Sequence, residues 1–364
     1  MSLIIRPATE ADDAGILKLI SNTPQPGRIM LNFERMPSFF LGANVTCERP
    51  DIWLAEESGS EGDILAVFNI GSRRMYFNGE ARNIRYAHDL RIDPAKRGST
   101  LLVRLFRRLR EMLEDNEWMQ TVILSDNDTS LNTIGSGRAG LPTYYPCGDI
   151  ESSMLFAPPL FLSNRGLTVR PAEEKDLPAM QAFMDELAPQ RQFYPVYQLQ
   201  DLLTGSGYYR GLKISDYWLA WRGNELQGMA GIWDQKSFKQ TRAISYTKEM
   251  AFIRHAYNLY GAIFGGVRLP PAGGLVNYRP LHSVLIRNND PHVLAVLLRP
   301  LTKIMQNQRA ALVCGFFEND PLREAVRRFR RQTMASRHFL VSYGDNPVPT
   351  LDPERIPYIE VARL

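Results

Sequence analysis

Long hydrophobic runs and cysteines are both scarce in this sequence. No apolar stretch reaches the roughly 18 residues that a membrane-spanning helix needs, so we expect no membrane partner. Residues 1–6 lead straight into a strand-like segment and lack the basic and apolar regions of a signal peptide. Cys47, Cys147 and Cys314 are few, odd in number and far apart, which argues against a disulfide framework or a zinc site. These absences favour a cytoplasmic protein without a bound metal.

A strong excess of either charge is also missing. The 43 basic and 39 acidic residues leave a formal net charge of +4, which helps to attract an anionic cofactor but is no sign of nucleic acid as a partner. A basic cluster near the end lacks interleaved aromatic residues, so nucleic-acid binding is not expected there either. Its members are Arg323, Arg327, Arg328, Arg330 and Arg331.

The sequence does contain an internal repeat. A strand-like segment ending in Arg6-Pro7-Ala8 precedes an acidic turn and an amphipathic helix, and the same order recurs after Arg170-Pro171-Ala172. Thr9 or Asp12 in the first copy, and Glu173 or Asp176 in the second, suit the N-cap of the helix. Further on, Asp51-Ile-Trp53-Leu-Ala55 is matched by Asp216-Tyr-Trp218-Leu-Ala220. With 364 residues the chain is long enough for two domains, which we expect at 1–158 and 159–364 with the boundary near Pro158.

Both halves mix strands and helices. In the first we expect strands at 3–6, 52–57, 64–77, 83–92, 120–125 and 149–156, helices at 11–21 and 98–114, and irregular structure at 23–50. In the second we expect, after the matching hairpin, a helix at 247–264, strands at 281–287, 310–316 and 338–343, and helices at 290–306 and 320–331. This order predicts α/β (α+β) domains, each with a mixed central sheet flanked by helices.

One stretch of the first half carries a motif. Leu90, Ile92 and Pro94 alternate at a strand end, and Arg97-Gly98 follow just before a helix begins. This pattern resembles the GNAT superfamily of acyl-CoA N-acyltransferases, in which a central strand ends in apolar-x-apolar-x-Pro and leads into Arg/Gln-x-x-Gly-x-Gly/Ala. The order of strands and helices resembles the family over the whole chain, whereas the sequence motif is found only in this loop.

The resemblance implies acetyl-CoA, or another acyl-CoA, as co-substrate. The amino end of the helix would hold the pyrophosphate, because its free N–H groups and dipole favour anions, while the strand end would hold the pantetheine arm. Thr100 and Leu102 stand where the family has glycines. An ungapped match, which we prefer to a two-residue deletion, places Leu101, Leu105 and Leu109 on the core face of the helix. The implied cofactor-binding residues are Leu90, Arg91, Ile92, Arg97, Gly98, Ser99, Thr100, Leu101, Leu102 and Asn132.

The second half departs further from the pattern. The loop after its equivalent strand, 282–294, has no glycine, and Asp290 with Pro291 reads as an ordinary helix start. We therefore expect the cofactor in the first half. The mycothiol synthases have a similar layout, with one working and one structural half.

The resemblance also implies direct transfer, in which a base takes a proton from the amine and an acid protonates the leaving thiolate. His88 and Asp89 are the candidates for the base, and because strand side chains alternate, only one of them is expected to face the cleft. Tyr144 and Tyr145 are the candidates for the acid, with Tyr145 preferred for its spacing to Gly148. Both tyrosines also suit packing roles, and Cys147 suits a structural thiol.

The sequence thus predicts an N-acyltransferase, with acetyl the expected group and a primary amine of a small molecule or peptide as acceptor. The alternative is a catalytically inactive GNAT-like scaffold that senses a ligand or binds a protein. The replaced glycines motivate this alternative. The sequence does not indicate the oligomeric state.

Overall fold

The fold is described from a computed structural model, which covers residues 3–59, 63–125, 127, 131, 140–264, 266 and 268–364. The first half contains three described helices and nine strands. The helices are α1 (Asp13–Ser21), α2 (Phe39–Thr46) and α3 (Leu101–Met112). The strands are β1 (Leu3–Pro7), β2 (Ile29–Glu34), β3 (Ile52–Glu57), β4 (Ile64–Asn69), β5 (Ser72–Phe77), β6 (Glu80–Tyr86), β7 (His88–Ile92), β8 (Trp118–Leu124) and β9 (Thr143–Ala157).

The second half repeats this mixture. Its helices are α5 (Leu177–Leu187), α6 (Lys248–Phe264), α7 (Pro291–Asn307) and α8 (Arg323–Val326). Its strands are β10 (Thr168–Pro171), β11 (Tyr217–Arg222), β12 (Glu225–Ile232), β13 (Gln240–Tyr246), β14 (Tyr278–Ile286), β15 (Ala311–Phe317) and β16 (Arg330–Ser342). Among the described residues, no helix is both long and apolar enough to cross a membrane.

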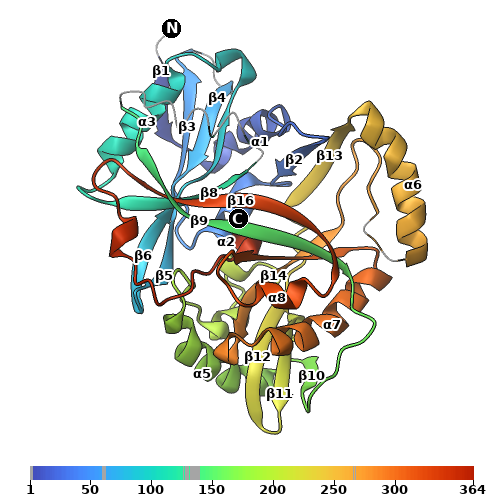
Figure 1. The fold of residues 1–364 in the computed structure, drawn as a ribbon. Helices are drawn as coiled ribbons and strands as arrows, with labels where there is room; N and C mark the ends of the chain where they lie inside the picture. Colours follow the sequence, from blue (N-terminus) through green and yellow to red (C-terminus); the bar gives the residue numbers. More distant parts are fainter. Residues whose placement is uncertain are drawn as a thin grey trace.

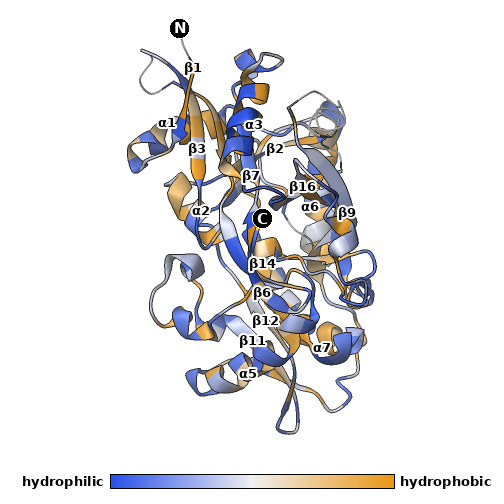
Figure 2. Ribbon diagram, turned by 90° about the vertical axis from the view of Figure 1, so that its left-hand side faces the viewer, coloured by the Kyte–Doolittle hydropathy of each residue, from blue (hydrophilic) through white to orange (hydrophobic). Residues whose placement is uncertain are grey.

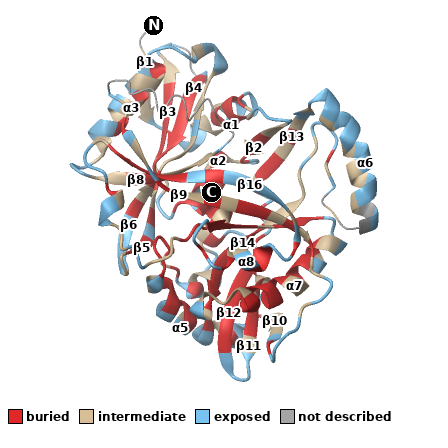
Figure 3. Cartoon of the chain, viewed as in Figure 1, coloured by how far each residue is buried: buried red, intermediate tan, exposed pale blue. Residues whose placement is uncertain are grey.

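The mixed α/β class predicted from the sequence is confirmed. One sheet has the order β1-β3-β4-β7, a second has the order β10-β11-β12-β14-β15-β9-β16-β8-β6-β5, and β13 pairs with β2. Helices cover the sheets, with α1 and α3 near one end of the molecule and α5 and α7 near the other (Figure 1). Strands such as β3, β4, β11 and β12 are largely buried, whereas α6 is mostly exposed (Figure 3).

The repeated Arg-Pro-Ala motif has a physical cause. Arg6 binds both carboxylate oxygens of Asp12 at 2.8 Å, and Asp12 also accepts from the Thr9 backbone N–H at 2.7 Å, which closes the turn before α1. Arg170 binds Asp176 at 2.6 and 2.7 Å in the same way. The arginine on each opening strand therefore fixes the start of the helix that follows. Thr9 and Glu173 form capping boxes with Asp12 and Asp176, and these two aspartates hold the N-cap positions of α1 and α5 without a side-chain cap bond of their own.

The two halves share their central sheet. β16 lies between β8 and β9, and β9 pairs on its other side with β15. The long crossing strands β9 and β16 run side by side through the middle of Figure 1. The helix expected at 320–331 is wrong: α8 has four residues and β16 begins at Arg330, because the chain from there pairs with β9 and β8 of the first half. Nearby, Arg323 and Arg331 pair with Glu151, so part of the basic cluster is neutralised.

The segment 23–50, expected to be irregular, contains β2 and α2. β2 pairs antiparallel with β13, which lies more than 200 residues later, from Glu34 opposite Gln240 to Ile29 opposite Tyr246. Because no local pattern announces such a partner, sequence reasoning missed this strand. Helix α2 packs on α1 through Phe39 and Ala43, and it ends at Cys47 beside the sheet.

Candidate functional site

The sheet opens between β7 and β8. β6 runs parallel to β8 through Arg85 and Tyr86, and the N–H of Ala87 donates to the carbonyl of Gln120 at 2.8 Å. From His88 onward the chain pairs with β4 instead, so that β7 and β8 belong to different sheets. This is the V-shaped split that a pantetheine arm would need for backbone pairing. It occurs on the strand where the sequence predicted the cofactor.

A β-bulge sits at the start of the split. His88 lies opposite Asn69 and Arg91 opposite Val67, so Asp89 and Leu90 have no partner on β4. Asp89 has a φ of 53°, in the left-handed region that non-glycine residues rarely adopt. Among the described residues, no side chain accepts a hydrogen bond from the backbone N–H of Asp89 or Leu90. Side chains of the described residues therefore do not occupy this bulge.

The loop that follows β7 presents an exposed helix start. Asp93 accepts from the N–H of Ala95 at 2.8 Å, and Gly98 has a φ of 78° with open space where a Cβ would lie. Arg97, Ser99 and Thr100 are exposed as well. Since the first turn of an α-helix leaves its N–H groups without partners inside the helix, this loop offers an anion site.

Helix α3 anchors the loop. Leu101, Leu105 and Leu109 are buried against β3 and β4, as the ungapped match predicted. Leu102 is half-buried and belongs to none of the hydrophobic clusters among the described residues. Its side chain therefore does not pack into the core beneath the split.

Arginines surround the split. The Nε of Arg91 is buried and has no hydrogen-bond partner among the described residues. Burial lowers the pKa of Arg91, and the charges of Arg35 and Arg97 lower it further, while Asp89 opposes them. The unpartnered Nε of Arg91 and the exposed Arg97 fit an anionic group, so these two residues suit the phosphates of a coenzyme A ester.

The side chains of His88 and Asp89 contact each other, whereas the sequence predicted that they point to opposite faces of the strand. The left-handed backbone at Asp89 breaks the strand alternation that the sequence predicted, and the Asp89 carboxylate lies 3.1 Å from Nδ1 of His88. Arg35 donates to the same carboxylate at 3.1 and 3.3 Å. Although burial acts to raise the pKa of Asp89, the charge of Arg35 and the hydrogen bond of His88 hold it well below its usual range. Asp89 is thus a paired anion that orients His88.

Cys47 lies on the other side of this histidine. Its Sγ is 3.7 Å from Nε2 of His88, and its side chain is fully buried. Burial acts to lower the pKa of His88, but the hydrogen bonds to Asp89 and Cys47 and their charges raise it. Sequence reasoning gave Cys47 no role, because it lies 41 residues before His88 and only the fold joins them.

The remaining predicted residues lie elsewhere. Tyr144 and Tyr145 are on β9, separated from β8 by β16, and not in a loop beside the split. Tyr144 packs on Phe339, and burial raises its pKa, whereas the hydroxyl of Tyr145 donates to the carbonyl of Gly344 at 3.1 Å. Asn132 lies outside the described residues. Neither tyrosine is thus brought beside His88 as an acid.

The second half has an equivalent split, but it is filled. On β14, His282 lies opposite Gly231 and Leu285 opposite Met229, so Ser283 and Val284 form the same bulge. Ser283 has a φ of 53°, as Asp89 has.

Here the chain's own last residues occupy the bulge amides. Glu360 accepts from the Ser283 N–H at 2.8 Å, and the Tyr358 hydroxyl lies 3.1 Å from the Val284 N–H. Sequence reasoning missed this segment, which no motif marks. Figures 1 and 2 both place the end of the chain at the centre of the molecule.

Arg363 fastens this segment between the halves. It is fully buried, donates to the carbonyls of Val45 and Tyr208, and stacks on the Tyr208 ring with 3.4 Å between the guanidinium carbon and the ring centroid. Its Nη2 lies 3.2 Å from Nε2 of His282. Arg363 and its partners therefore fill the space beside the split of the second half.

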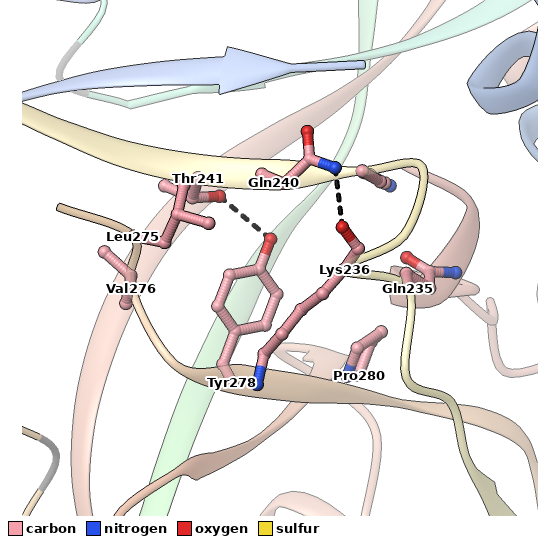
Figure 4. Close-up of a pocket in the computed structure, with 9 residues that line it drawn as sticks. Gln235, Lys236, Gln240, Thr241, Leu275, Val276, Tyr278 and Pro280 are labelled. Atoms are coloured by element: carbon pink, nitrogen blue, oxygen red, sulfur yellow. Dashed lines mark hydrogen bonds between the residues drawn. The ribbon is translucent and has the colours of Figure 1, made fainter. Parts of the chain in front are cut away.

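A hollow lies between β13 and β14 next to this segment (Figure 4). Gln240 donates to the carbonyl of Lys236 at 2.6 Å, and the hydroxyls of Thr241 and Tyr278 lie 2.9 Å apart across it. Lys239 also lines the hollow and donates to the backbone oxygen of Leu364. Burial lowers the pKa of Lys239, and the charge of Arg35 lowers it further.

In the described ranges, no cluster of three or more His, Cys, Asp or Glu side chains is placed to hold a metal ion. Cys47, Cys147 and Cys314 are all free thiols.

No protein-family model matches the sequence, and no curated protein matches it either. Solved structures do match the fold. A GCN5-related N-acetyltransferase from Sphaerobacter thermophilus aligns over 97% of this chain and 98% of its own, with a TM-score of 0.57 and 13% identity. The N-myristoyltransferase of Saccharomyces cerevisiae, with bound myristoyl-CoA, aligns over 98% of this chain and 85% of its own, with a TM-score of 0.56 and 8% identity.

A third similar structure is the glucosamine N-acetyltransferase region of a fungal multi-domain β-N-acetylglucosaminidase. It aligns over 93% of this chain and 38% of the fungal one, with a TM-score of 0.60 and 9% identity. Together with the two open strand pairs and their matching bulges, these similarities show that the chain has the fold of the GCN5-related N-acetyltransferases.

Proposed function

We propose that the protein is an acyl-CoA-dependent N-acyltransferase with one cofactor site, in the half spanning 1–158. The net reaction moves an acyl group, with acetyl the expected one, from acyl-CoA to a primary amine of a small molecule or peptide. The observation that carries this proposal is the contrast between the two bulges. The amides of Asp89 and Leu90 lack a side-chain acceptor among the described residues, whereas those of Ser283 and Val284 are occupied by Glu360 and Tyr358.

The residues around the first split have distinct roles in this proposal. Arg97, Gly98, Ser99 and Thr100 would hold the pyrophosphate at the start of α3, with Arg91 close by. The backbone of 90–92 would pair with the pantetheine arm. The bulge amides of Asp89 and Leu90 would receive the thioester oxygen as negative charge develops on it. Coenzyme A, when bound, supplies the activated acyl group as a thioester.

His88 is the proton-handling group in this site. Its Nδ1 contacts Asp89, so Nε2, which lies 3.7 Å from Sγ of Cys47, would exchange the proton. In the direct transfer that the sequence predicts, His88 takes the proton of the amine.

A thiol-release assay tests the net reaction. Acetyl-CoA is mixed with the protein and a broad panel of primary amines, and free coenzyme A is measured with a thiol reagent. We expect amine-dependent release with at least one amine, and a loss of about 100-fold or more in the variant His88→Gln. The variant His255→Gln, which changes an exposed histidine on α6, serves as the control and keeps full activity.

The inactive scaffold is the competing function. Its motivation was the replaced glycines, but Gly98 keeps the left-handed backbone of the loop and Leu102 does not pack into the core. Absence of thiol release with every amine and several acyl chain lengths favours the scaffold. Turnover of a single amine eliminates it.

A further inference from the structure

Helix α6 exposes a group of large apolar side chains. Phe252 is 84% exposed, Leu259 and Ile263 are each 67% exposed, and Ile253 is 49% exposed. No α6 side chain belongs to a hydrophobic cluster among the described residues. The helix lies at the outer edge of the molecule, away from the helices that cover the sheets (Figures 1 and 3). An apolar group of this size on an exposed helix marks an interaction surface.

The opposite face of α6 holds the helix to the rest of the molecule. The side-chain amide of Asn258 exchanges two hydrogen bonds with the backbone of Leu269, at 2.9 and 2.8 Å. The guanidinium of Arg254 lies over the ring of Tyr246, with 5.7 Å to the centroid. Tyr257 shares this face and is half-buried. These contacts fix the rotation of the helix, so that its exposed apolar residues are turned away from the body.

The exposed residues include one straight stripe. Phe252, Ala256, Leu259 and Ile263 follow one another at spacings of four, three and four residues, which is the a/d spacing of helices that pack on one another. All four are exposed, and the stripe spans about three turns of the helix. The outer side of α6 therefore has the pattern of a surface that packs on a second helix.

The stripe is complementary to itself. If two copies of α6 lie antiparallel with the stripes centred on each other, Ala256 of one copy faces Leu259 of the other, and Phe252 faces Ile263. The small alanine opposite the larger leucine lets the helices approach closely without a void. A parallel pair would set Ala256 against Ala256 between larger side chains and leave a gap. In the antiparallel pair each contact occurs twice about a twofold axis, which is the commonest symmetry of protein dimers.

The exposed area is large enough for such a pair. At about 200 Å² for a fully exposed large side chain, Phe252, Ile253, Leu259, Tyr260 and Ile263 together expose roughly 600 Å² per chain. Two copies would then remove roughly 1,200 Å² from water, whereas a specific interface needs about 1,000 Å². The helix pair thus reaches the size of a stable but reversible interface.

The charges of α6 favour a second helix over a membrane surface. Lys248, Glu249 and Arg254 are its charged residues, and together they carry a net charge of +1. A helix that lies on an anionic membrane has many lysines and arginines on its polar face. Because α6 lacks such a face, electrostatic attraction to a membrane is weak.

We propose that α6 is a dimerisation helix, which packs antiparallel on the α6 of a second copy of this chain through Phe252, Ala256, Leu259 and Ile263. This inference does not depend on the proposed function, because α6 takes no part in the split between β7 and β8. Each chain of the dimer would keep its own split.

Sedimentation equilibrium tests the dimer. We expect twice the mass of one chain, with dissociation in the micromolar range that suits an interface of this size. Leu259→Glu should weaken the dimer by about 100-fold or more, because it places a charge at the centre of the apolar stripe. Glutamate favours helices, so the circular dichroism spectrum should not change.

Leu203→Glu, the same change at an exposed leucine of the second half, is the control and should dimerise as the wild type does. A wild type that remains a single chain at about 100 μM overturns the proposal. Equal dimerisation of Leu259→Glu also overturns it. A single chain that binds vesicles of phosphatidylcholine and phosphatidylglycerol, and loses that binding in Leu259→Glu, assigns the stripe to a membrane instead.

Disulfide trapping tests the antiparallel arrangement. Cys47, Cys147 and Cys314 are buried free thiols, so a cysteine added to the exposed face of α6 is the accessible one. Under mild oxidation, a mixture of Ala256→Cys and Leu259→Cys should form a linked dimer faster than either variant alone. Faster linkage of either variant by itself would show parallel helices and overturn the antiparallel arrangement.

Discussion

Arg35 balances the charge of the buried cluster at the split. Its side chain is 4% exposed and that of its partner Asp89 is 11% exposed, so neither charge is well solvated. Gly42 makes room for it, since a Cβ there would lie 2.3 Å from Cδ of Arg35. The orientation of His88 therefore depends on a side chain from the segment before α2.

Removal of Arg35 should be costly. We expect Arg35→Met to lower the free energy of unfolding by about 3–5 kcal/mol, because it leaves the Asp89 carboxylate buried beside His88 alone. Adding Asp89→Asn to that variant should restore about 1 kcal/mol or more. Urea denaturation measures both.

Arg82→Met, which removes an exposed partner of Glu80, is the control and should stay within about 0.5 kcal/mol of the wild type. A similarly small loss for Arg35→Met would show that Asp89 is solvated and not held by this pair.

The residue scale also shows where sequence reasoning reached its limit. Arg97 and Gly98 were predicted because a strand end, a glycine and a helix start lie within a few residues of one another. The pairing of His88 with Cys47, and that of Asp89 with Arg35, were missed because each joins residues more than 40 positions apart. No local pattern encodes such contacts.

At the scale of elements, the repeat was readable because its key contact is local. The arginine and the aspartate of each copy lie six residues apart, and their ion pair fixes the helix start. β2 and the first part of β16 were missed for the opposite reason, because β2 forms on β13 and β16 forms on β8 and β9, whereas the strand expected at 338–343 matches the end of β16. Distant pairing overrides local propensity in both cases.

The two caps make a matched prediction. Asp12→Asn and Asp176→Asn should each lower the free energy of unfolding by about 1–3 kcal/mol, because each removes a charged cap and an arginine partner. Asp63→Asn, which changes an exposed partner of Lys18, should cost less than about 0.5 kcal/mol. Thermal or urea unfolding at neutral pH gives the comparison.

The cap at Asp12 also predicts a pH dependence. The hydrogen bonds from Arg6 lower the pKa of Asp12 to about 2, below that of an aspartate in an unfolded chain. Its contribution to stability is therefore complete above about pH 4 and is lost as the pH falls toward 2. The difference between wild type and Asp12→Asn should shrink over that interval. A difference that stays constant down to pH 2 would contradict the assigned ion pair.

At the scale of the whole molecule, the two halves share the sheet that contains β9 and β16, and their strand splits differ in what occupies them. Each has the same bulge at the same point of an open strand pair, at Asp89 and at Ser283. The segment that carries Tyr358, Glu360 and Arg363 fills the second split. The loop sequences suggested that only the first half binds a cofactor. The structure has a matching difference, because the end of the chain fills the split of the second half.

Calorimetry with acetyl-CoA tests the central claim most directly, because it counts cofactor sites. We predict one site per chain in the wild type, and a loss of about tenfold or more in affinity for the double variant Arg97→Glu with Gly98→Pro. Arg222→Glu makes a similar charge change on an exposed residue of the second half and should bind as the wild type does. No heat and no thermal shift at millimolar cofactor, two sites per chain, or unchanged binding by the double variant would contradict the account.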